Sequence, residues 1–187
     1  MKKYTIFTLF ILGVFTTYIA QSQDPSNLLN TIPQNQLILR GHVGEQTDQI
    51  FKNRIVAQDY DHLVEPFRFK NETRLWQMEF WGKWMLGAVA AWEYTHDKEL
   101  MDHMSKSVAS ILETQLPNGY IGNYPVENQL TNWDIWGRKY VLLGLLRYHD
   151  ITNSKKALKA AKKPSLGNGQ QDKKCWKSWL LNTKCRV

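Results

Sequence analysis

The sequence predicts an all-α fold made of helical hairpins that stack into an array or toroid, and three observations carry this prediction. Residues 75–92 are apolar on nearly every side of a helix, which is typical of a helix buried in a larger assembly. A narrow apolar stripe at helical spacing follows, which indicates an amphipathic outer helix; it comprises Met101, Met104, Val108, Ile111 and Leu112. The same order then returns 57 residues later, from Gly87 to Gly144.

The chain begins with the features of an export signal. Lys2 and Lys3 precede an apolar run over residues 4–20, and Ala20-Gln21-Ser22 offers small residues where a signal peptidase cuts. We therefore expect residues 1–22 to be a signal peptide, and the protein to be periplasmic or secreted with no stable membrane span after cleavage. The alternative is a membrane anchor, for which the run is slightly short.

The net charge of +7 is concentrated near the carboxyl terminus. Residues 155–187 hold ten Lys or Arg and one acid, whereas residues 23–154 hold 12 basic and 16 acidic residues, a net of −4. No patch outside this basic end interleaves aromatic residues with Arg, so we expect no nucleic-acid partner. Two cysteines are too few for a disulfide framework or a thiolate zinc cluster, and no metal site is predicted.

Residues 23–74 form a less regular lead-in segment. Leu37-Ile38-Leu39 precedes two glycines, and a helix is predicted from about Thr47 to Val56. We expect this segment to pack against the helices that follow it and not to be an independent domain.

Residues 75–163 contain the two predicted hairpins. The first buried helix breaks at Thr95-His96-Asp97, where Asp97 is a good N-cap for the outer helix. Thr152 and Ser154 occupy the equivalent positions of the second hairpin. Two hairpins cannot bury an inner helix on all sides, and such arrays need about three repeats. The toroid is therefore incomplete in this chain, which either oligomerises or is part of a longer protein.

The loop between the hairpins, residues 116–132, combines a turn signal at Asn118-Gly119 with Tyr120, Tyr124 and several Asn residues. Aromatic faces and amide groups suit a sugar, which has an apolar CH face and a rim of hydroxyl groups. The alternative is an ordinary surface connection.

From Pro164 the helical pattern stops, and residues 164–187 read as an aberrant basic tail that holds both cysteines. A composition shift within a helix predicts a truncated or frame-shifted reading of a longer gene. The alternative is a genuine tail closed by a Cys175–Cys185 disulfide, which export permits.

Two carboxylates near the starts of the buried helices are the candidates for a cleft. A glycosidase of the usual kind needs two carboxyl groups roughly 5–10 Å apart, and Glu79 and Asp134 are the best placed. We expect them to contact substrate and not to catalyse; the alternative is that each is a satisfied buried polar group or a first-turn helix acid. Most tryptophans at helical spacing fit core packing, but Trp76 and Trp133, at helix starts, are predicted to reach a ligand. The predicted substrate-binding residues are Trp76, Glu79, Tyr120, Trp133 and Asp134.

These motifs occur in an order that resembles a known family. The series comprises Gly44, Asn53-Arg54, Asp61, Phe67-Arg68, Trp76, Glu79, Gly82, Thr95-His96-Asp97, Gln115, Gly119-Tyr120-Ile121 and Trp133-Asp134-Ile135-Trp136. Over Leu39–Lys163 it resembles the amino-terminal quarter of the β-L-arabinofuranosidases of glycoside hydrolase family 127. The resemblance implies an (α/α)6 barrel and glycosidase activity, and it allows zinc in the intact family member.

The chain also departs from the family pattern. Lys83, Trp133 and Tyr140 stand where the family usually has His, so the resemblance does not fix the sugar as arabinofuranoside. The resemblance places the nucleophilic Cys, the zinc ligands and the catalytic Glu beyond residue 163, and none is carried over to Cys175 or Cys185. We therefore expect no catalytic residue and no cofactor in this chain.

The leading interpretation is an amino-terminal fragment of an exported bacterial glycoside hydrolase that acts on plant-type glycans and is inactive alone. The alternatives are a non-catalytic secreted helical module that binds oligosaccharides, and a lyase or other enzyme of similar fold, since fold does not fix chemistry.

Overall fold

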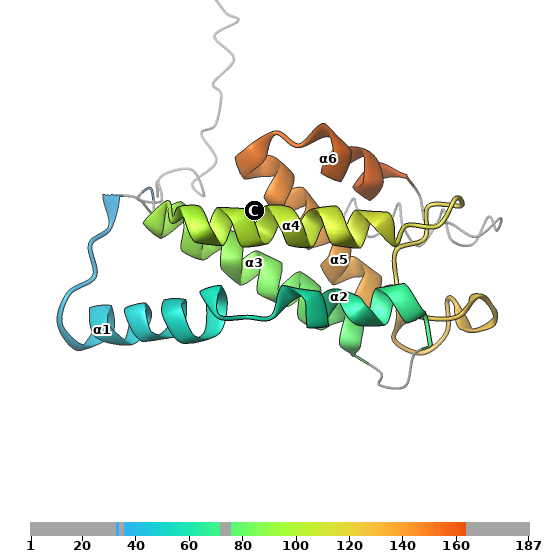
Figure 1. Ribbon diagram of the computed structural model, residues 1–187, viewed down its shortest axis with the longest axis horizontal. Coiled ribbons are helices and arrows are strands. Elements are labelled where there is room, and N and C mark those ends of the chain that lie inside the picture. The colour runs from blue at the N-terminus through green and yellow to red at the C-terminus, as the bar shows by residue number, and fades with distance from the viewer. Residues whose placement is uncertain (1–32, 34–35, 72–75, 164–187) are drawn as a thin grey trace, which may run out of the picture. The chain divides into compact units, whose positions relative to one another are not determined.

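The computed structural model describes residues 33, 36–71 and 76–163. Apart from Pro33, all of them belong to one structural unit, Gln34–Val187. The described part of the chain is helical and contains no strand, which confirms the predicted all-α class (Figure 1). Within it, no helix combines the length and apolar character that crossing a membrane requires. The predicted signal peptide (1–22), the tail (164–187) and the Cys175–Cys185 pairing lie outside the described residues.

The described residues of the lead-in include α1 (Gly41–Ile50), η3 (Phe51–Val56) and α2 (Tyr60–Phe69). The predicted start of a helix near residue 47 is wrong, because α1 already begins at Gly41 and η3 is a π-helix. Asp59 caps α2 by accepting hydrogen bonds from the backbone N–H groups of Asp61 and His62, each at 3.0 Å. Trp84 Nε1 donates to the carbonyl oxygen of Ile55 at 3.0 Å, which fixes η3 against the helix that carries Trp84.

Two hairpins follow, formed by α3 (Gln77–Thr95) with α4 (Lys98–Glu113) and by α5 (Asp134–Thr152) with α6 (Lys155–Lys162). Both inner helices, α3 and α5, have 19 residues and start 57 residues apart (134 minus 77). Both also end at a left-handed residue, and the two outer helices, α4 and α6, start after side-chain caps at Asp97 and Ser154. The repeat predicted from the sequence is therefore a repeat of structure.

The inner helices α3 and α5 approach each other closely, and glycines make this possible. A methyl group on Gly82 would lie 2.3 Å from the backbone oxygen of Tyr140, far inside contact distance. In the same way, a Cβ on Gly144 would lie 2.9 Å from the ring of Trp81. Arg147 Nη2 adds a link across this pair by donating to both carboxylate oxygens of Glu93 at 3.1 Å.

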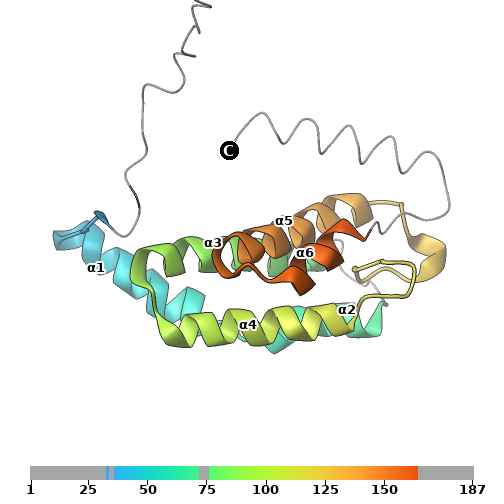
Figure 2. The same ribbon diagram turned by 90° about the horizontal axis from the view of Figure 1, so that it is seen from above.

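The core lies between α3, α5 and the helices around them. The largest fully buried side chains come from α2, α3, α4, α5 and the loop, and they include Val64, Phe67, Trp81, Met85, Leu100, Met104, Ile111, Tyr120 and Leu145. Trp81 Nε1 donates to Ser107 Oγ at 2.8 Å, which joins α3 to α4. Seen from above, α4 runs along α2, and α6 lies against α5 (Figure 2). The predicted stripe of the outer helix is confirmed, since Met104, Val108 and Ile111 are buried.

Candidate functional site

An exposed cluster of aromatic rings lies where the inner helices begin. Trp76 precedes α3 and Trp133 precedes α5, and their ring centroids are 6.4 Å apart in an edge-to-face arrangement. Trp133 also contacts Trp136 (6.1 Å), which contacts Tyr140 (5.5 Å). We call Trp76, Trp133, Trp136 and Tyr140 the aromatic face. The three indoles keep between 41% and 49% of their surface exposed, so they offer apolar ring surface to a ligand.

Two lysines lie over this aromatic face. Lys139 Nζ is 3.7 Å from the ring centroid of Trp136 and 4.7 Å from that of Tyr140, while Lys83 Nζ is 5.2 Å from the Tyr140 centroid. A cation above an aromatic ring is attracted by the negative face of the ring. The lysines therefore place hydrogen-bond donors beside the rings.

Glu79 supplies a carboxylate at the edge of the aromatic face. It lies in the first turn of α3 and is 8% exposed. Its Oε2 accepts a hydrogen bond from Trp136 Nε1, and its Oε1 accepts one from Lys83 Nζ at 3.0 Å. Glu79 thus fixes the orientation of the Trp136 ring and the position of Lys83. An acid in the first turn is also favoured by the helix dipole.

Asp134 is the centre of a buried hydrogen-bond network and not part of an open cleft. Its side chain is 0% exposed, and it accepts from the hydroxyl of Tyr120 (2.9 Å), the backbone N–H of Leu130 (2.8 Å) and Arg138 Nη1 (3.2 Å). Burial raises the pKa of Tyr120, and the negative charge of Asp134 raises this pKa further. The phenol therefore stays protonated and serves as a donor.

The loop between the hairpins is fixed by hydrogen bonds to the buried side chains of Tyr120 and Asp134. The hydroxyl oxygen of Tyr120 accepts from the backbone N–H of Tyr124 at 3.0 Å, and both tyrosines are almost fully buried. The turn expected at Asn118-Gly119 is present: Gly119 has φ +95°, and Asn118 Oδ1 accepts from the N–H of Tyr120 at 3.0 Å. The tyrosine rings are part of the core, whereas both interpretations of the loop, a sugar-binding loop and an ordinary surface connection, expected a surface position.

The structure therefore separates the five predicted site residues into two groups. Trp76, Trp133 and Glu79 lie at the aromatic face, whereas Tyr120, from the loop, and Asp134, at the start of α5, are buried and hydrogen-bonded to each other. Sequence reasoning omitted Trp136 from the site, because its helical spacing fits a core residue equally well. The feature of the sequence that could have placed Trp136 in the site is its position three residues after Trp133, near the start of the same helix.

The zinc that the family resemblance allows does not fit the described residues. Among residues 36–71 and 76–163, no three or more His, Cys, Asp or Glu side chains are grouped so that they could hold a metal ion. No step through a metal is derived for this part of the chain.

Two repeated helical hairpins, with paired inner helices that present aromatic rings at their starts, make the described part of the chain an all-α structure. The family that the sequence matches is of the α/α-barrel type. The family model described as "Beta-L-arabinofuranosidase, GH127 catalytic domain" matches residues 16–165, and the chain belongs to this family. Neither the curated proteins nor the solved structures yielded a match.

Proposed function

We propose that the chain is the amino-terminal part of an exported β-L-arabinofuranosidase-like glycoside hydrolase, and that its aromatic face contacts a sugar of a plant-type glycan. The observation that carries the proposal is the set of four contacting rings at the starts of the inner helices of a family member. Membership suggests a glycosidase and a glycan substrate. The sugar, the linkage and the contact residues belong to the proposal.

The chemistry of the aromatic face suits a neutral sugar ring. Indole surfaces that are 41–49% exposed can stack on the CH face of a pyranose or furanose. Lys83 and Lys139 offer donors to ring hydroxyls, and Glu79 offers an acceptor that is already oriented by Trp136. Tyr120 and Asp134 act indirectly, because their network fixes the loop next to Trp133.

Titration with arabino-oligosaccharides, followed by tryptophan fluorescence, tests this assignment. We expect saturable binding that W133A reduces by about tenfold, the equivalent of about 1.4 kcal/mol, because the variant loses the ring on which the sugar stacks. The matched control is W92A, because Trp92 stacks on His96 at the opposite end of α3 (ring centroids 4.9 Å apart). Equal losses in W133A and W92A would contradict the proposal.

Catalytic inactivity of the 187-residue chain is also part of the proposal. It is supported by the family resemblance, which places the nucleophilic Cys and the catalytic Glu beyond residue 163. The purified chain should release no monosaccharide from arabinan, and release of arabinose would refute this. Reading the DNA after codon 163 in all three frames tests the fragment: a continuing hairpin pattern supports it, and its absence from every frame contradicts it.

Export remains a proposal that rests on residues 1–22. Amino-terminal sequencing of the secreted or periplasmic product should start at Gln23. A product that retains Met1 in the cell membrane would instead support the anchor.

The second candidate is a non-catalytic secreted module that holds oligosaccharides on the aromatic face. The exposure of Trp76, Trp133 and Trp136 favours it. Sugar binding together with an intact gene that ends at Val187 would support this module and contradict the proposal that the chain is a fragment of a longer enzyme.

A further inference from the structure

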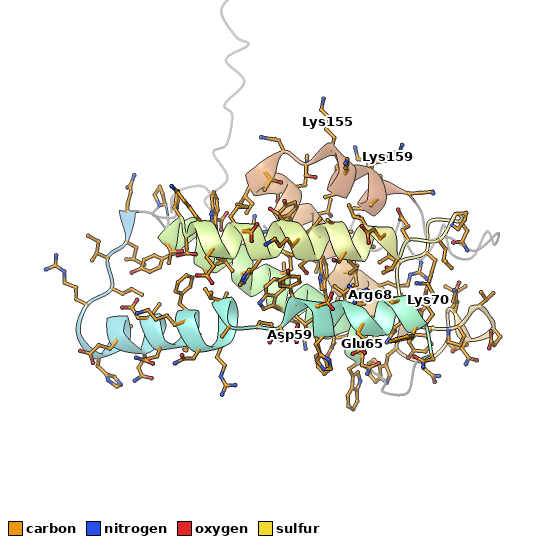
Figure 3. All side chains as sticks on the ribbon, in the orientation of Figure 1. Asp59, Glu65, Arg68, Lys70, Lys155 and Lys159 are labelled. Atoms are coloured by element: carbon orange, nitrogen blue, oxygen red, sulfur yellow. The ribbon has the colours of Figure 1, made fainter. Side chains whose placement is uncertain are left out.

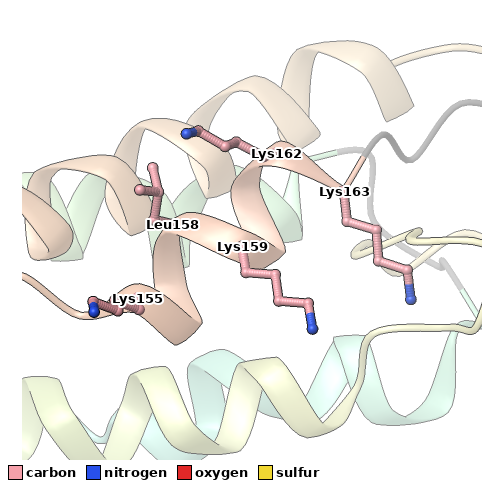
Figure 4. A pocket seen from close by; sticks show the side chains of 5 residues that line it. All are labelled: Lys155, Leu158, Lys159, Lys162 and Lys163. Carbon is pink, nitrogen blue, oxygen red and sulfur yellow. The ribbon is translucent and has the colours of Figure 1, made fainter.

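The last described helix, α6, carries a dense cluster of lysines on its exposed side. We call Lys155, Lys159, Lys162 and Lys163, together with Leu158, the lysine surface. These five residues line an open hollow of about 460 Å³ (Figure 4). Lys155 and Lys159 extend from α6 (Figure 3), and all four lysines are exposed. Lys156, from the same helix, is exposed as well.

The positive charge of this surface is not balanced within the described part of the chain. No ion pair there involves a lysine of α6, whereas Lys83, Lys106 and Arg138 each pair with an acid four residues earlier. On α6 the same spacing joins Lys155 to Lys159 and Lys159 to Lys163, and like charges at this spacing repel. The first turn of α6 also contains no acid, so Lys155 and Lys156 stand where the helix dipole disfavours a cation, whereas Lys159 and Lys162 lie in the last turn, where it favours one.

We propose that the lysine surface binds an acidic polysaccharide through the carboxylates of its uronate units. A polyanion relieves the repulsion between the lysines, and its several charges meet several lysines at once. Lysine is a compact charge on a flexible stem, which suits single carboxylates spaced along a chain. The choice of a polysaccharide as the polyanion rests on the proposed function, because plant-type glycans include uronate-containing chains.

The composition and burial of α6 disfavour the other polyanions. Its apolar residues Ala157, Ala160 and Ala161 are buried against the hairpin and Leu158 is half-buried. No continuous apolar face is therefore left to enter a lipid surface. The residues that line the hollow include no aromatic side chain and no Arg. Single-stranded nucleic acids are bound through such aromatic platforms.

The lysine surface is separate from the aromatic face but belongs to the same hairpin. α6 runs back along α5, so Lys162 and Lys163 lie toward the end at which Trp133 begins α5 (Figures 1 and 2). Gln115 Nε2 joins α6 to the intervening loop by donating to the carbonyl oxygens of Gly119 (2.9 Å) and Ala160 (3.2 Å). The surface would thus hold an acidic chain next to the sugar-contacting end.

Binding of polygalacturonate to the full 187-residue chain, measured by calorimetry at several NaCl concentrations, tests the proposal. We expect binding that weakens with salt and that K159E/K162E reduces by about tenfold. The matched control is K52E/K98E, which reverses two exposed lysines elsewhere with the same change in net charge. It should change the affinity by less than about twofold, and melting curves of both variants establish that each is folded.

The proposal is overturned by a lack of binding, by equal weakening in both variants, or by binding of neutral arabinan that K159E/K162E weakens as much as it weakens binding of polygalacturonate. Tighter binding of duplex DNA or phosphatidylglycerol vesicles, lost in K159E/K162E, assigns the surface to another class of partner and also overturns it. W133A should leave polygalacturonate binding intact. A failure of arabino-oligosaccharide binding therefore reports on the aromatic face alone, and a failure with polygalacturonate reports on the lysine surface alone.

Discussion

The two hairpins have nearly the same backbone arrangement, but they carry different side chains where their inner helices begin. Where each inner helix ends, the hydroxyls of Thr95 and Thr152 donate to the carbonyl four residues earlier, at 2.9 and 2.7 Å. These hydroxyls also accept from the N–H groups of the capping residues Asp97 and Ser154, at 3.2 and 3.3 Å. The turn is thus repeated bond by bond 57 residues apart (152 minus 95).

At the other end, where the helices begin, only the tryptophans are repeated. Trp76 corresponds to Trp133, but Glu79 corresponds to Trp136, and these two side chains are hydrogen-bonded to each other. Asp134, which anchors the loop, corresponds to Gln77. The shared spacing of the repeat therefore builds the fold, whereas the candidate site combines the repeated tryptophans with positions at which the two hairpins differ.

The largest effect should come from Asp134, the residue that the first hairpin lacks. We expect D134A to cost about 3–5 kcal/mol of unfolding free energy, because it leaves Arg138 buried without its carboxylate. Urea denaturation measures this loss. The control is D150A, whose ion pair with Arg147 is 3.4 Å long and exposed, and which should cost no more than about 0.5 kcal/mol. A small effect of D134A would mean that the loop does not depend on this network.

The contact between the inner helices can be tested within a single helix. G82A should cost about 1–3 kcal/mol, because the added methyl group meets the backbone of Tyr140 at 2.3 Å. G87A places its methyl group at an ordinary 3.5 Å from Ile55 Cδ1 and should stabilise α3 by about 0.5–1 kcal/mol. Thermal unfolding of both variants measures the difference. Effects of the same sign would contradict the close approach of α3 and α5.

Much of this scaffold could be predicted from the sequence, because its signals are local. Apolar periodicity located α3 to α6, and the types of residue at 95–97 and 152–154 identified the turns. The start of α1 was missed because two glycines lower its helix propensity. Long-range contacts support this region instead, such as the bond from Leu39 N–H to the Tyr94 hydroxyl at 3.3 Å.

The candidate site was only partly predictable, for a different reason. The periodicity of α5 places Trp136 on a helix, but it cannot tell whether another element covers that side; in the structure the ring is 41% exposed. The composition of the loop likewise suggests a polar surface. Its tyrosines are buried because the Tyr120 hydroxyl donates a hydrogen bond to Asp134, fourteen residues later. A hydrogen bond between these two positions produces no periodic pattern in the sequence.

The smallest expected effect tests whether the repeated turns contribute equally. D97A and S154A each remove a side-chain cap, at 2.8 Å to the N–H of Leu100 and at 3.3 Å to that of Ala157. Losing such a cap costs about 1 kcal/mol. We expect D97A to cost more, because its bond is shorter and its carboxylate also interacts with the dipole of α4. Chemical denaturation measures both losses.

A further variant, S154D, gives α6 the same capping residue, Asp, that α4 has at Asp97. It should stabilise the protein by about 0.3–1 kcal/mol, since it adds a negative charge at the start of a helix whose first turn contains Lys155 and no acid. The gain should shrink in high salt, because screening weakens an exposed charge. A gain that salt leaves unchanged would mean that hydrogen-bond geometry, and not charge, distinguishes the two caps.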